Sequence, residues 1–237
     1  MPWKLLIAYG LGYFALHFGL LFTGMRLGVS AGLASLVLQT QVFFTIGLSY
    51  WLLKEKPTAW KLSGAFLAFL GIVIVSAHTN AELSFFGLIF ILMAAVSFAS
   101  GNLISKKIGS IDPLALVVWG NLVAIPPMLV VSLLWDGHEP MISSLTQISF
   151  QSVISLFYIV YLSTLLGFSV WSFLLSRHPA ASVAPFTLLV PVFGFFGSMF
   201  ILGESLPLWK IEAAILVVSG LAINVFGPQL RKLARVG

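Results

Sequence analysis

Polar side chains inside long apolar stretches are the residues of this sequence with the types and positions to do chemistry. Two amides, Gln39 and Gln41, flank Thr40 in the middle of the apolar stretch 31–53. An amide there can hydrogen-bond the ammonium or carboxylate group of a zwitterion, and polar groups in hydrocarbon are costly enough to mark functional sites. Alternatively, these amides only link neighbouring helices. Because residues two apart diverge by about 200° around a helix, both amides cannot face one cavity.

Two prolines, Pro185 and Pro191, interrupt the apolar stretch 182–202. Each proline removes a backbone donor and frees a carbonyl about one turn earlier. In lipid, freed carbonyls are tolerated only against protein or a water-filled cavity. We therefore expect a bend beside a cavity, where the carbonyls contact a substrate amine, or else a simple packing kink or hinge.

His17, in the apolar stretch 5–23, is the only ordinarily titratable side chain of the sequence that lies well inside such a stretch. Histidine changes charge near neutral pH, which makes His17 a candidate for proton coupling. The alternative is a hydrogen-bonded packing residue. Tyr161 and Thr164, three residues apart in the stretch 153–175, share a helix face and are the preferred pair to line a cavity. Further cavity candidates are Asn102 and Asn121.

The elements that must position these residues follow from composition. Of 237 residues, 59% are hydrophobic and 8% charged, against about 25% charged in an ordinary soluble domain. With a mean hydropathy of +1.08, this excludes a soluble enzyme. Eight stretches are long and apolar enough to cross a bilayer as helices, so the sequence predicts an all-α polytopic membrane protein: 5–23, 31–53, 60–77, 85–104, 113–135, 153–175, 182–202 and 208–226.

The basic residues predict how these helices are oriented. Ten of the twelve Lys and Arg lie in loops on the side of the N-terminus, and only Arg26 and Lys210 lie on the other. Because basic loops stay in the cytoplasm, both termini are expected there. This use also explains the net charge of +5 without a nucleic-acid partner. The absence of cysteine and the scattering of four histidines argue against a metal site, and no cofactor is expected.

An internal repeat runs through the chain at a constant spacing of 149 residues. It pairs identical residues: Glu55 with Glu204, Trp60 with Trp209, Lys61 with Lys210, and Gly71 with Gly220. The predicted topology turns the two copies opposite ways, as in the inverted repeats of many secondary transporters. We interpret these glutamates, tryptophans and glycines as structural. Each glutamate precedes a helix, whose dipole its carboxylate would complement.

The repeat divides the chain into residues 1–78 with three helices, 79–228 with five, and a basic cytoplasmic tail, 229–237. The mates of the stretches 85–104 and 113–135 would fall upstream of Met1. The sequence therefore predicts an N-terminally shortened version of a fold with five plus five helices. Gly64, Ala68 and Gly71 predict close helix contact, within the chain or in a homodimer.

Several of these residues carry a resemblance to a known family. The pattern Glu55…Trp60-Lys61…Gly64…Gly71 with its second copy resembles the EamA repeat of the drug/metabolite transporter superfamily. Four further segments resemble the bacterial EamA branch: 31–46, Gly101-Asn102 with Lys106-Lys107, 183–192 and 223–227. The resemblance implies a multi-pass inner-membrane exporter of small amino-acid metabolites of the cysteine pathway. It also implies alternating access driven by proton exchange.

Three alternatives remain open at this point. One is a shortened remnant that folds but does not transport, and another is a carrier of a different small metabolite or drug. The third, an intramembrane enzyme, would need a nucleophile with a base or a metal pair. The sequence has no Gly-x-Ser-x-Gly or His-Glu-x-x-His motif, and we expect no enzyme activity.

Overall fold

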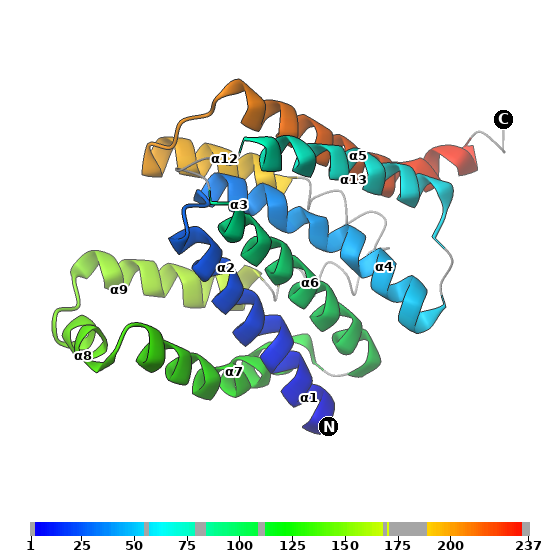
Figure 1. Cartoon of the computed structure of the whole chain (residues 1–237). Helices are drawn as coiled ribbons and strands as arrows, with labels where there is room; N and C mark the ends of the chain where they lie inside the picture. Colours follow the sequence, from blue (N-terminus) through cyan, green and yellow to red (C-terminus); the bar gives the residue numbers. More distant parts are fainter. Residues whose placement is uncertain are drawn as a thin grey trace.

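The computed structural model describes residues 3–54, 57–78, 84–108, 112–167, 170 and 189–233, and every regular element in these ranges is a helix (Figure 1). Irregular helical segments carry the label η. In chain order the elements are α1 (Trp3–Tyr9), η1 (Gly10–Leu16), α2 (His17–Arg26), α3 (Ala31–Val37), η2 (Leu38–Thr40), α4 (Gln41–Leu53), α5 (Ala59–Ala77), α6 (Phe85–Ile108), α7 (Pro113–Trp135), α8 (His138–Thr146), α9 (Phe150–Phe157), η3 (Tyr158–Leu166), α12 (Leu189–Leu202) and α13 (Leu208–Leu233).

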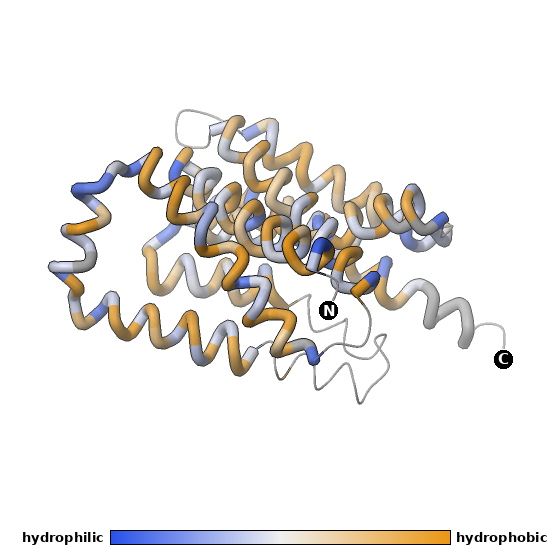
Figure 2. The backbone as a smooth tube through the Cα atoms, turned by 90° about the horizontal axis from the view of Figure 1, so that it is seen from below, coloured by the Kyte–Doolittle hydropathy of each residue, from blue (hydrophilic) through white to orange (hydrophobic). Residues whose placement is uncertain are grey.

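Six of the eight predicted spans are confirmed as helices long and apolar enough to cross a membrane: Trp3–Arg26, Ala31–Leu52, Ala59–Ala77, Phe85–Ser105, Leu114–Trp135 and Leu208–Gly227. The other two are represented by shorter apolar helices, Phe150–Leu166 and Leu189–Leu202. Figure 2 shows hydrophobic residues along the helices, and hydrophilic residues gathered mainly at their ends and connections. The chain is thus an all-α, multi-pass membrane protein.

Local sequence signals explain where several helices begin. Ser30, Asp112 and Ser149 each accept a hydrogen bond from a backbone N–H in the first turn of α3, α7 and α9. Such side chains satisfy donors that a helix start leaves free. The short helix α8 was not expected, since its sequence carries the turn residues of a loop.

The closest crossing joins α5 and α13, which run side by side in opposite directions (Figure 1). A Cβ placed on Gly64 would meet the Gly220 carbonyl oxygen, and one on Gly71 would lie 2.9 Å from the Ala213 carbonyl oxygen. These two contacts are equivalent under the 149-residue spacing, because Gly64 corresponds to Ala213 and Gly220 corresponds to Gly71. The small residues Gly64, Ala68 and Gly71 of α5 therefore pack against α13 of the same chain.

Other features also recur 149 residues apart. Lys54 and Gly203 both have a positive φ, of 58° and 67°. The π-helical segment η1 covers residues 10–16, and π-helical η3 covers the equivalent residues 159–165 within its bounds. The Trp60 ring lies against Gly227, and the Trp209 ring stacks on His78 at 4.9 Å, in the equivalent arrangement.

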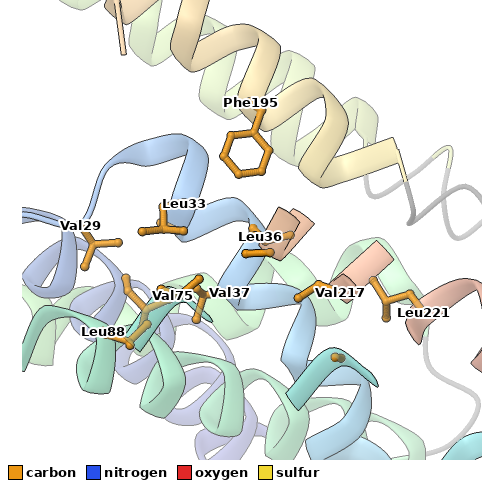
Figure 3. Close-up of a cluster of buried hydrophobic side chains, with 13 residues drawn as sticks. Val29, Leu33, Leu36, Val37, Val75, Leu88, Phe195, Val217 and Leu221 are labelled. Carbon is orange, nitrogen blue, oxygen red and sulfur yellow. The ribbon is translucent and has the colours of Figure 1, made fainter. Parts of the chain in front are cut away.

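Two clusters of buried apolar side chains hold the helices together. The larger one, drawn in Figure 3, joins α3, α5, α6, α12 and α13 and includes Leu33, Val75, Leu88 and Val217. The smaller one joins α1, η1, α6 and α7 around Tyr13. Because α6 contributes packing residues to both clusters, it connects the two halves of the bundle, by which we mean the helices around the larger cluster and those around the smaller one.

Candidate functional site

The second membrane span changes from α-helix to a 3₁₀ turn in its middle, where the sequence places the amides, and we call this turn the break. Helix α3 ends at Val37, a single tight 3₁₀ turn follows over Leu38–Thr40, and α4 resumes at Gln41. The Thr40 hydroxyl donates to the Val37 carbonyl of the preceding turn over 2.7 Å. A 3₁₀ turn inside a helix often marks a functional hinge.

The two amides lie in different surroundings, as their angular separation predicts. Gln39 is 2% exposed, whereas Gln41 is half-buried. Gln39 and Thr40 therefore belong to the protein interior at the level of the break. Gln41 lies at its edge, where its backbone carbonyl accepts a hydrogen bond from the Thr45 hydroxyl over 2.8 Å.

The first span is also irregular in its middle, and His17 begins the α-helix that follows. Its Nδ1 lies 3.0 Å from the Ala94 carbonyl oxygen of α6, so Nδ1 must donate this bond. The ring packs against Phe98 at 4.9 Å and is 5% exposed. One turn earlier, the Ser97 hydroxyl donates to the Gly12 carbonyl over 2.7 Å. His17 is thus a hydrogen-bonded interior residue fixed to α6.

Helix α6 brings the two irregular regions together, because it contacts both η1 and η2. Its middle carries Ala94, Ala95 and Ala99, all fully buried, and such small side chains allow close approach of other helices. In the described part of the chain the buried polar side chains are His17, Gln39, Thr40 and Ser198. His17 is hydrogen-bonded to α6, and Gln39 and Thr40 belong to η2, which contacts α6. We take His17, Gln39 and Thr40 as the candidate site.

The other predicted cavity residues do not all join this site. Asn102 lies half-buried on α6, two turns beyond Ala94. Asn121 donates from Nδ2 to the Val117 carbonyl of its own helix over 2.8 Å. The Tyr161 side chain is 54% exposed, and its ring contact is with Phe157 of the same helix.

Thr164 is half-buried on η3, one turn from Tyr161. Pro191 is fully buried near the start of α12. Pro185 and Glu55 lie outside the described residues. Within the described ranges, no three His, Asp or Glu side chains gather closely enough to hold a metal ion.

Glu204 binds a helix other than the one expected. Its Oε1 accepts from the Ala31 N–H over 2.8 Å and its Oε2 from the Gly32 N–H over 3.4 Å. The carboxylate therefore complements the dipole of α3 and not that of α13, which follows it in the chain. That a glutamate carboxylate would lie at a helix start could be predicted from the sequence. Which helix start lies near it depends on tertiary packing.

Two further polar side chains, Ser97 and Asn224, need separate mention. The bond from Ser97 to the backbone of the first span was not expected, because a serine in an apolar helix usually bonds its own helix. Asn224 on α13 has a buried Nδ2 without a hydrogen-bond partner among the described residues. Its Cβ and backbone N lie next to Gly64, at the crossing of α5 and α13.

Comparison with known proteins places the chain in a family. The family model described as the EamA-like transporter family matches residues 1–77 and 85–226. A protein named "Probable amino-acid metabolite efflux pump" from Salmonella typhimurium is 40% identical over all of this chain and 81% of its own length. Its Escherichia coli namesake is 39% identical with the same coverage, and an uncharacterized transporter of Bacillus subtilis is 27% identical over 94% of this chain and 75% of its own. With its apolar helices and this match over nearly all of its length, the chain belongs to the EamA-like transporter family and is a transporter, not an enzyme.

Proposed function

We propose that this protein exports small amino-acid metabolites of the cysteine-pathway type across the bacterial cytoplasmic membrane. The observation that carries the proposal is the 40% identity, over the whole chain, to a protein named as an amino-acid metabolite efflux pump. The candidate site fits a zwitterionic substrate, because an amide has both a donor and an acceptor and can therefore bind a carboxylate or an ammonium group.

The transport mechanism that we propose is alternating access between two inverted repeats, 1–78 and 79–228, followed by the basic tail 229–237. The features that recur 149 residues apart support this division. In particular, Ala68 and Val217, which are exchanged for one another by this spacing, lie fully buried in the shared core. A pseudo-two-fold axis between them would relate the two repeats.

Both termini face the cytoplasm in this proposal. Three contacts support a common outer face, because each joins two helix ends that the distribution of basic residues assigns to the outer side of the membrane. They are the ion pair of Arg26 with Asp136 at 2.7 Å, the bonds from Ala31 and Gly32 to Glu204, and the stack of His78 on Trp209.

Proton exchange is the proposed driving force, with His17 as the coupling residue. Its Nδ1 is committed to the Ala94 carbonyl, which fixes the ring while Nε2 remains the atom that gains or loses a proton. The ring lies on α6, the helix that connects the two halves of the bundle. A change of charge at this position would therefore act on the contact between the halves.

The proposal is tested by export from cells. Cells that overproduce the chain are loaded with labelled cysteine or O-acetylserine, and efflux is compared with cells carrying the empty vector. We expect faster efflux from the producing cells. Equal efflux, with the protein shown to be inserted in the membrane, would contradict the proposal and favour a protein that folds without transporting.

A further inference from the structure

The carboxylate of Glu204 links two parts of the chain that are far apart in sequence. Glu204 lies in the connection between α12 and α13, and its two oxygens accept hydrogen bonds from the first backbone N–H groups of α3. Lys210 reaches the same place, with Nζ 3.5 Å from the Ser30 hydroxyl and 3.1 Å from the Ser205 carbonyl oxygen. We call this set of contacts between Glu204, Lys210 and the start of α3 the clasp.

The surrounding backbone is shaped to admit the carboxylate. Gly32 has no side chain, and a Cβ there would lie 3.2 Å from Glu204 Oε2 and would also meet the Ser198 hydroxyl. Gly203, just before Glu204, has a φ of 67°, which favours glycine. The Glu204 N–H in turn bonds the Ser198 carbonyl over 3.1 Å, which ties the connection back to α12. Three separate features of the sequence thus serve one contact.

The position of the clasp relates it to the candidate site. Helix α3 runs for seven residues from the clasp to the break at Leu38–Thr40, which holds Gln39. Between them, α3 and α12 are in close contact, because a Cβ on Gly194 would meet the Ser35 side chain. A way from the outer end of α3 toward the break would therefore require the start of α3 to separate from the α12–α13 connection.

We propose that the clasp is the outer gate of the transporter: it is closed in this structure, and it must open each time the site faces outward. The inference rests on the proposed transport function and on alternating access. A purely structural clasp would stay closed throughout the cycle, so the two roles differ in what happens when the clasp is weakened or locked.

The first test measures opening without any substrate. The chain has no cysteine, so Ser198→Cys places a single thiol behind the clasp, at a site that is 3% exposed. Glu204→Gln loses the charge and keeps one acceptor. We expect it to raise the rate at which a membrane-impermeant maleimide labels position 198 by about tenfold, the effect of losing one charge-assisted hydrogen bond.

Matched variants separate gating from unfolding. Glu212→Gln removes an exposed carboxylate at the same end of α13 and should leave labelling of position 198 unchanged. Ala124→Cys places the thiol in the other core cluster and should stay protected in the Glu204→Gln background. Unchanged labelling of position 198 in Glu204→Gln would overturn the proposal, as would equal labelling of position 124.

The second test locks the clasp. The Lys210 ammonium bonds the Ser30 hydroxyl and the Ser205 backbone carbonyl, so positions 30 and 205 lie on either side of one lysine. Ser30→Cys and Ser205→Cys therefore place two thiols across the clasp for linkage by a short bifunctional thiol reagent. Cross-linking should abolish export of labelled cysteine or O-acetylserine, and cleavage of the linker should restore it. Full export by the cross-linked protein would overturn the gate. If the protein without linker exports nothing, the transport function fails instead, while the labelling test still decides whether the clasp opens.

Discussion

The crossing of α5 and α13 allows a quantitative prediction for Gly220→Ala. The new Cβ would lie 2.9 Å from the backbone N of Ala68 and would also meet the Gly64 carbonyl oxygen. An ordinary contact needs about 3.4 Å, so the first neighbour alone must yield by about 0.5 Å. Both obstacles are backbone atoms of another helix, so no side chain can rotate away.

The expected cost follows from two opposing terms. Inserting a group into a filled interior costs about 1–3 kcal/mol, and immovable backbone neighbours place this case near the upper end. Alanine is a better helix former than glycine by about 1 kcal/mol, which offsets part of the loss. We expect Gly220→Ala to lower the free energy of unfolding by about 2 kcal/mol.

The control is Gly197→Ala on α12, where an added Cβ has nothing within 4 Å. This variant keeps only the favourable term and should raise the free energy of unfolding by up to about 1 kcal/mol. Titration of the purified protein with a denaturing detergent, followed by circular dichroism, measures both variants. If Gly220→Ala were as stable as Gly197→Ala, the helices would not be in contact at this crossing and our account of the fold would be wrong.

Three further predictions concern single positions. Lys54→Gly should raise the free energy of unfolding by about 0.5–1 kcal/mol, because the φ angle of Lys54 is positive. Gly203→Ala should lower it by about 1 kcal/mol in the same detergent titration, because the φ angle of Gly203 is positive too. Equal stability of the two variants would refute the shared backbone geometry. Asn224→Val should raise it by about 1 kcal/mol, since it removes a buried unpaired amide, and a loss of stability would mean that the amide has a partner. His17→Asn should fold normally but export labelled cysteine independently of external pH, and an unchanged pH dependence would exclude His17 from coupling.

Much of the architecture could be predicted from the sequence, because long apolar segments and scattered charges leave few alternatives to a helical membrane bundle. The pairing of α5 with α13 also follows from sequence once the 149-residue spacing is known, since equivalent glycines mark both helices. The bounds of irregular helix segments could not be predicted. A π-helix or a 3₁₀ turn changes the hydrogen-bond register of a few residues, and apolar side chains on every face hide that change.

The site was predictable in its residue types and less so in its partners. His17, Gln39 and Thr40 stand out because they are polar in the middle of apolar stretches, and the structure buries all three. That α6 contacts the segments carrying all three is a property of packing. The same limit applies to Glu204, whose role at a helix start was expected but whose actual partner, α3, lies about 170 residues earlier in the chain.

The pairing of α5 with α13 also has a consequence for how the protein is made. About 130 residues separate the end of α5 at Ala77 from the start of α13 at Leu208. At about 5–20 residues per second, the ribosome needs roughly 7–26 seconds to cover that distance. Throughout this interval the glycine face of α5 has no partner, so it is exposed to lipid or to the insertion machinery. Final assembly of the larger core must therefore wait until the last helix has entered the membrane.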